Sequence, residues 1–122
     1  MREPTMTETE TTEFKKSLAE LKQGLISLAA MLNKHGHAQL WFGIAPNGKP
    51  MGLDLNEKTL RDVSQAIAAH IEPRIYPEIT QQTVAGENCL HIRANGPQKP
   101  YFAYQAAEIP PVRVVLSAGP SV

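Results

Sequence analysis

Apolar residues recur at helical spacing in the N-terminal third of the chain. From about residue 13, they fall on one helical face while the lysines lie off it: Leu18, Leu21, Leu25, Leu28, Ala29 and Leu32. The segment ends at Asn33-Lys34-His35-Gly36, where cationic residues precede a glycine suited to the left-handed C-cap. The pattern predicts an amphipathic helix of about five turns.

A second helical pattern follows Asp54 and Asn56, either of which can cap a helix through its side-chain oxygen. Its apolar positions are Leu60, Val63, Ile67 and Ile71. Pro73 prevents the helix from continuing, because proline has no backbone N–H and its ring clashes with the preceding turn.

The other apolar runs are short and typical of strands. Residues 40–54 contain an Asn47-Gly48 turn between strand-like flanks and predict a hairpin, bent or bulged because of Gly43, Pro50 and Gly52. Trp41 and Phe42 would point to opposite faces, so one of them is expected in the core. Residues 79–84 and 89–94 predict a second hairpin around 85–88, and residues 101–104 predict a last strand.

This order of elements predicts an α+β fold. We expect a mixed or antiparallel sheet of four to six strands, with two main helices packed on one face. Residues 1–11 are acidic and threonine-rich and are expected to form a flexible arm, residues 12–105 the domain, and residues 106–122 a divergent or poorly ordered tail. Within that tail, residues 112–116 are suited to an edge strand.

Length and charge narrow the class of protein. The 122 residues fit one domain, and no apolar run approaches the roughly 18 to 20 residues of a membrane span. The N-terminus lacks the apolar core of a signal peptide, and the single Cys89 excludes an internal disulfide, so a cytoplasmic location without membrane contact is expected. The net charge is zero, well below that of a protein that coats DNA.

Three motifs carry a resemblance to a known family. Glu8 to Lys15 is similar to an opening Glu-(Ser/Thr)-x-x-x-Glu-Phe-Lys, and Lys99 to Phe102 is similar to Lys-Pro-(Tyr/His)-x. Between them, Leu40 to Ile44, Asn47-Gly48 and Met51 to Leu53 match a strand, Gly-(Val/Ile), turn and Gly-Leu. Over residues 8–105 the chain resembles the Schlafen/AlbA-like DNA-binding domain, formerly described as divergent AAA.

The resemblance implies a nucleic-acid-binding module of bacterial transcriptional regulation, with DNA favoured over RNA and no catalysis of its own. The expected phosphate contacts are basic residues: Lys15, Lys16, Lys34, Lys49, Arg74 and Lys99. His35, Arg61 and Arg93 belong to the same scattered set. A homodimer would give so small a module more contact surface.

Two alternatives remain open. Schlafen-type nucleases use two glutamates and an aspartate, and Glu8 and Glu13 match the glutamates, whereas Ala45-Pro46 replaces the Asp-Asp that commonly follows the Gly-Val. The first alternative is therefore a metal-dependent ribonuclease, although acidic residues before a helix are also favoured by its dipole. The second is a protein–protein interaction domain. No cofactor or metal is predicted, because phosphate-binding glycine motifs and standard zinc spacings are lacking.

Overall fold

The computed structural model describes residues 6–104, so the predicted tail 106–122 and its edge strand lie outside the described residues. The described elements are β1 (Thr12–Lys15), a 3-10 helix (Leu18–Glu20), α1 (Leu21–His35), β2 (His37–Phe42), α2 (Glu57–His70), β3 (Ile71–Glu72), β4 (Glu78–Val84), β5 (Glu87–Asn95) and β6 (Phe102–Ala103). None of the helices in this range is both long and apolar enough to cross a membrane.

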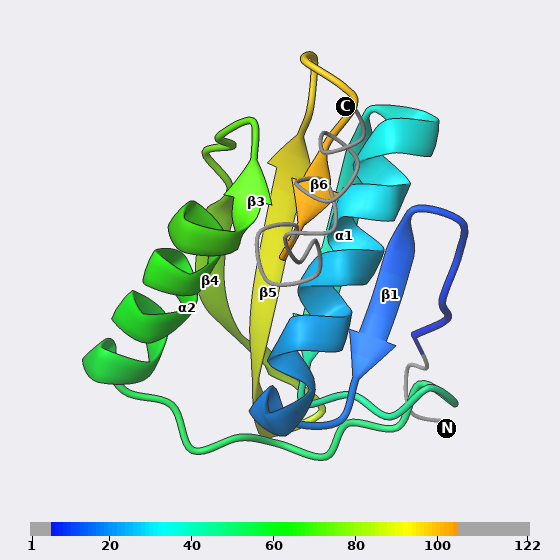
Figure 1. Ribbon diagram of the computed structural model, residues 1–122. Coiled ribbons are helices and arrows are strands. Elements are labelled where there is room, and N and C mark those ends of the chain that lie inside the picture. The colour runs from blue at the N-terminus through cyan, green and yellow to red at the C-terminus, as the bar shows by residue number, and fades with distance from the viewer. Residues whose placement is uncertain (1–5, 105–122) are drawn as a thin grey trace, which may run out of the picture.

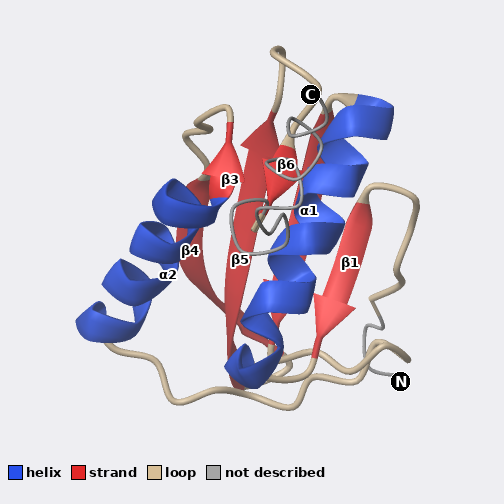
Figure 2. Cartoon of the chain, viewed as in Figure 1, coloured by secondary structure: helices blue, strands red, loops and turns tan. Residues whose placement is uncertain are grey.

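The main sheet has four strands in the order β1-β2-β5-β4. β1 runs parallel to β2, while β2, β5 and β4 pair antiparallel, and β3 and β6 form a small separate sheet. Both α-helices cover the same face of the main sheet (Figures 1 and 2). The predicted α+β fold with two helices on one face of a mixed sheet is confirmed.

The main core lies between this face and the two helices. Its fully buried members include Leu25, Leu28 and Leu32 from α1 and Leu40, Phe42, Leu90 and Ile92 from the central strands. α1 approaches β2 closely at Gly24, where an added Cβ would lie 2.8 Å from the Phe42 ring. The predicted caps are also confirmed: Gly36 closes α1 with a φ of 81°, and the Asn56 side chain accepts a hydrogen bond from the Thr59 amide.

The predicted start of the first helix is wrong. Residues 12–15 form strand β1, and α1 begins only at Leu21, after a 3-10 turn capped by the Ser17 hydroxyl. Phe14 lies on the sheet face opposite the helices, whereas Glu13 and Lys15 face α1. Pairing with β2 satisfies the backbone of this short segment, so Glu13 is not a helix-start residue.

The first predicted hairpin is only partly formed. β2 ends at Phe42, a single bridge joins Ile44 to Pro50 around the Asn47-Gly48 turn, and residues 51–54 are not a strand. Gly52 has a φ of 87°, and an added Cβ there would collide with the Glu87 carboxylate. The chain therefore leaves the sheet at this point and crosses toward α2.

The second hairpin is confirmed and tighter than predicted. Its turn contains only Ala85 and Gly86, with φ values of 50° and 83°, which are typical of a two-residue hairpin turn. Residues 87 and 88, predicted to lie in the turn, belong to β5. The predicted last strand shortens to β6, which pairs with β3 and not with the main sheet.

Candidate nucleic-acid interface

The sheet face opposite the helices, called here the open face, is apolar at one end only. There Phe14, Ile44 and Cys89 form a small buried cluster, with Met6, Trp41 and Val84 packed around it. Farther along β2 and β5, this face carries polar side chains in register: His37 opposite Asn95, and Gln39 opposite Arg93. The helices leave these polar residues uncovered (Figure 1).

A stacked pair separates the two parts of the open face. The rings of Trp41 and His91 lie 4.2 Å apart at an angle of 26°. The Nε2 atom of His91 is 2.7 Å from the side-chain oxygen of Gln39. Partial burial lowers the pKa of His91, Arg93 lowers it further, and Glu78 opposes the shift. Burial and the charge of Arg93 therefore favour the neutral form of the His91 imidazole in the folded protein.

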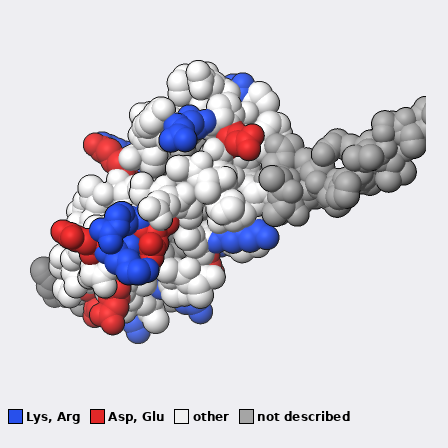
Figure 3. Space-filling view, turned by 60° about the vertical axis from the view of Figure 1, so that its left-hand side comes forward, with Lys and Arg blue, Asp and Glu red and all other residues white. Residues whose placement is uncertain are grey.

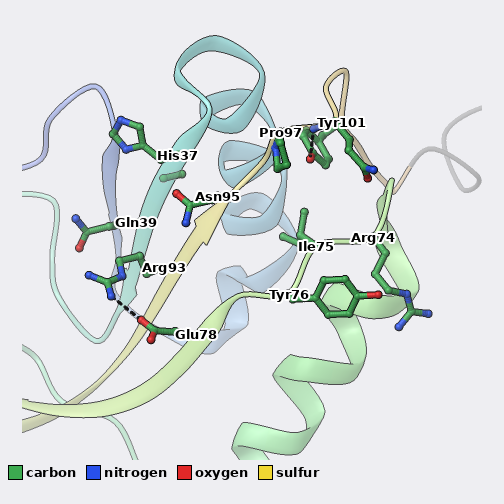
Figure 4. Close-up of a pocket in the computed structure, with 12 residues that line it drawn as sticks. His37, Gln39, Arg74, Ile75, Tyr76, Glu78, Arg93, Asn95, Pro97 and Tyr101 are labelled. Atoms are coloured by element: carbon green, nitrogen blue, oxygen red, sulfur yellow. Dashed lines mark hydrogen bonds and ion pairs between the residues drawn. The ribbon is translucent and has the colours of Figure 1, made fainter.

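A groove of about 730 Å³ lies at the polar end of the open face. Figure 4 shows Gln39 and Arg93 on one side of this groove, Arg74 and Tyr76 on the other, and Asn95 between them. Its walls come from β2 and β5, from the segment between β3 and β4, and from the loop after β5. Segments far apart in the sequence therefore build one polar concave surface.

The segment between β3 and β4 is fixed by its middle residue. Ile75 is buried, while its neighbours Arg74 and Tyr76 are exposed, Tyr76 to 85%. Pro73 and Pro77 bracket the segment and restrict its backbone. Arg74 and Tyr76 consequently share the outer side of a short, constrained segment.

The loop after β5 is tied to the end of α1. The Asn33 side chain accepts a hydrogen bond from the Tyr101 amide at 2.6 Å and donates one to the Tyr101 carbonyl at 2.9 Å. The Tyr101 hydroxyl in turn accepts a hydrogen bond from the Gln98 amide at 2.8 Å. Because Tyr101 is itself buried, these bonds fix the wall to which Gln98 belongs.

The six predicted phosphate contacts divide between two ends of the molecule. Lys34, Arg74 and Lys99 belong to segments that meet at the groove end, where Gly96 donates a hydrogen bond to the Gly36 carbonyl. Lys15, Lys16 and Lys49 belong to segments at the opposite end (Figure 1), where Gly43 and Ile44 donate to the Lys15 carbonyl.

Of the six predicted contacts, Arg74 alone lines the groove. Two of the three lysines at the opposite end, Lys15 and Lys16, lie near acidic groups. Lys15 Nζ is 3.3 Å from Glu13, and the Glu20 carboxylate accepts a hydrogen bond from the Lys16 amide. The face seen in Figure 3 likewise intersperses basic with acidic side chains and carries no continuous basic patch.

The two glutamates of the ribonuclease alternative are engaged in other contacts. Glu8 accepts a hydrogen bond from the Phe14 amide at 2.8 Å. Glu13 lies 3.3 Å both from the Ser27 hydroxyl and from the Lys15 ammonium group. Over residues 6–104, no group of three or more His, Cys, Asp or Glu residues is arranged to hold a metal ion.

Cys89 is a free, buried thiol at the apolar end of the open face. Its Sγ lies 3.6 Å from the Gly43 carbonyl oxygen, and burial raises its pKa. A thiol held neutral in this way is a packing residue.

Sequence reasoning missed the most exposed aromatic residue of the groove. Tyr76 lies in a stretch that the sequence predicts only as a connector between the second helix and the second hairpin. A signal was present: a lone apolar residue between arginine and tyrosine, bracketed by Pro73 and Pro77, indicates a short anchored segment with two outward side chains.

Two solved structures share the fold at low sequence identity. The DIP2311 protein of Corynebacterium diphtheriae matches with a TM-score of 0.63 and 19% identity, over 80% of this chain. This chain spans only 20% of that protein. The N-terminal domain of a DNA-helicase-related (RecG-related) protein of Nitrosomonas europaea matches with a TM-score of 0.55 and 17% identity, over 76% of this chain and 68% of the other.

No curated protein matches the chain. The family model described as "Schlafen, AlbA_2" matches residues 8–116, which is most of the sequence. The resemblance carried by the three sequence motifs is therefore confirmed, and the chain belongs to the Schlafen, AlbA_2 family.

Proposed function

We propose that this protein is a nucleic-acid-binding module, with DNA as the favoured polymer, and that the groove is its contact surface. The observation that carries the proposal is the groove itself: Arg74 and Arg93 stand on its two sides, with the polar side chains of Gln39, Asn95 and Gln98 nearby. Membership of the Schlafen, AlbA_2 family and a fold shared with a domain of a helicase-related protein support this function.

The charges of the groove suit phosphate. A guanidinium group can donate two parallel hydrogen bonds to phosphate oxygens. Arg93 now pairs with Glu78 at 2.7 Å, but both side chains are more than half exposed, so this pair contributes little to stability. A phosphate group can therefore displace Glu78 from Arg93 at low cost.

The proposal includes a regulatory role without cleavage, of the kind found in bacterial transcription. Glu8 and Glu13 stabilise strand β1 and its contact with α1, which supports a structural role for both. A homodimer would place two grooves on one nucleic acid and raise affinity through avidity.

Fluorescence anisotropy with labelled duplex DNA and structured RNA tests the proposal, at low and moderate salt. Arg74→Glu should weaken binding about tenfold and reduce the slope of log affinity against log salt by about one. Lys49→Glu makes the same charge change at the opposite end, so it serves as the matched control and should leave affinity within about twofold.

Two results would overturn this function. The first is the absence of binding to either polymer at low salt. The second is an equal loss of affinity in both variants, which would mean that the contact surface is not at the groove. The same samples, incubated with Mn²⁺ and run on a gel, should contain intact nucleic acid; cleavage abolished by Glu8→Gln would support the ribonuclease instead.

A further inference from the structure

We infer that the groove receives an unpaired nucleotide of a single strand, with its base stacked on the Tyr76 ring and an adjacent phosphate on Arg74. The inference rests on the proposed function and specifies which form of nucleic acid the groove binds. Three features of the groove carry it: the exposure of one ring, the rigidity of its segment, and the size and polarity of the space beside it.

The exposure of Tyr76 is not explained by folding. The side chain is 85% exposed, more than the other exposed large apolar residues in the described range, Met51 at 50% and Phe102 at 43%. The stacked ring pairs described in residues 6–104 are Trp41 with His91 and His70 with Tyr104, so those rings already contact a partner. Of the two tyrosines that line the groove, Tyr101 is buried, so Tyr76 is the one that offers a free ring face to a ligand.

The backbone segment that carries the Tyr76 ring is constrained before a ligand binds. Burial of Ile75 and the two flanking prolines reduce the freedom of the backbone on either side of Tyr76. Since ordering a flexible loop on binding costs free energy, a preordered platform loses less of its affinity. Arg74 lies two residues away on the same side of the segment, where it can contact a backbone phosphate next to the nucleotide whose base stacks on the ring.

The space beside the ring suits one nucleotide. Its volume of about 730 Å³ is in the range of sites for small molecules. The side chains of Gln39, Asn95 and Gln98 provide donors and acceptors for the edge of a base. A base inside a duplex is stacked on both faces and paired along its edge, so only an unpaired base can use both features.

Binding of single strands by substituted proteins tests the inference. Tyr76→Ala should weaken binding of labelled single-stranded DNA or RNA about five- to 100-fold, the range for loss of one stacked base. Tyr76→Phe keeps the ring and should retain wild-type affinity. Because the side chain is exposed and uncharged, Tyr76→Ala should keep the wild-type unfolding midpoint and salt dependence, and it should weaken binding of a duplex of equal length much less than binding of a single strand.

A second readout identifies the contact directly. A single-stranded oligonucleotide with one 5-iodouracil, irradiated in complex with the full chain, should form a crosslink that mass spectrometry maps to Tyr76. The same crosslinking experiment with a DNA oligonucleotide and, separately, with an RNA oligonucleotide shows which sugar the groove accepts. A crosslink to Trp41 in place of Tyr76 would overturn the inference, because Trp41 packs against the apolar cluster and does not line the groove.

The outcomes separate this inference from the proposed function. If the wild-type protein binds neither single strands nor duplexes, both fail. If it binds duplexes, responds to Arg74→Glu, and shows the same single-strand affinity with tyrosine or alanine at position 76, the inference alone fails. Selective loss of single-strand binding in Tyr76→Ala, rescued by Tyr76→Phe, supports it.

Discussion

The two faces of the main sheet are built from the same strands and differ in almost every other respect. On the helix side, Leu40 and Ile92 are paired, fully buried and part of the main core. On the open face, the neighbouring positions Gln39 and Arg93 are also paired but are polar and line a groove. Because strand side chains alternate, one backbone supplies a stabilising face and a face that is free for recognition.

The open face repeats this contrast along its own length. The end around Phe14 and Cys89 is sealed by apolar residues, while the end around Asn95 is left uncovered. The apolar end therefore anchors the strands whose other end forms the groove. Substitutions should consequently affect either stability or binding, depending on the face and the end of the sheet at which they lie.

Substitution of adjacent β2 residues that point to opposite faces of the sheet gives the largest expected difference in stability. Leu40→Ala removes a fully buried side chain and should lower the free energy of unfolding by about 2–5 kcal/mol. Gln39→Ala removes only a partly exposed side chain hydrogen-bonded to His91, and should cost at most about 1 kcal/mol. Urea denaturation measures both. Equal losses would contradict the division of the two faces into stability and recognition.

Asn33 joins the stabilising face to the groove, so its substitution should affect both. Asn33→Ala leaves the amide and carbonyl of the buried Tyr101 without partners and should cost about 1–3 kcal/mol. Hydrogen exchange of the Tyr101 amide should accelerate as the loop loosens.

The matched control for this prediction is Asn47→Ala. The Asn47 side chain also accepts a hydrogen bond from a backbone amide, that of Lys49, but in an exposed turn at the opposite end. Its loss should cost less than about 1 kcal/mol and leave exchange at Tyr101 unchanged. If the two variants lose equal stability, the bonds of Asn33 do not fix the groove wall.

The fold was largely predictable because its signals are local. The helical spacing of leucines in α1, the Asn56 cap and the hairpin between β4 and β5 each depend on neighbours in sequence, although the turn itself is two residues shorter than predicted. Strand β1 was missed because four residues are too few to establish a period. Its pairing with β2 across the intervening helix is also a non-local contact that a sequence pattern does not report.

The candidate site was predictable only in part, because the fold brings its residues together from separate segments of the chain. Arg74, Gln39 and Arg93 come from three separate segments, and no spacing in the sequence links them. The spacing of surface basic residues in the sequence does not show which of them the fold brings together. Lysines at opposite ends of the molecule, such as Lys34 and Lys49, were therefore grouped with Arg74. Tyr76 lacked a motif, since its importance depends on its exposure in the folded chain.

The smallest expected effect is a pH dependence that comes from His91 on the open face. Burial and Arg93 lower the pKa of His91 below its ordinary 6.5, so the unfolded chain takes up this proton more readily than the folded protein. The stabilisation from neutral His91 is therefore fully present above pH 6.5 and is lost as the pH falls through the lowered pKa. Urea denaturation at pH 8 and pH 5 should show this loss in the wild-type protein.

His91→Gln should remove that part of the pH dependence, because glutamine does not titrate. In NMR spectra the His91 ring should titrate below 6.5. Equal pH dependence in the wild-type and His91→Gln proteins would mean that the folded protein does not desolvate the His91 ring. The Trp41–His91 stack would then not mark the boundary between the sealed and uncovered ends of the open face.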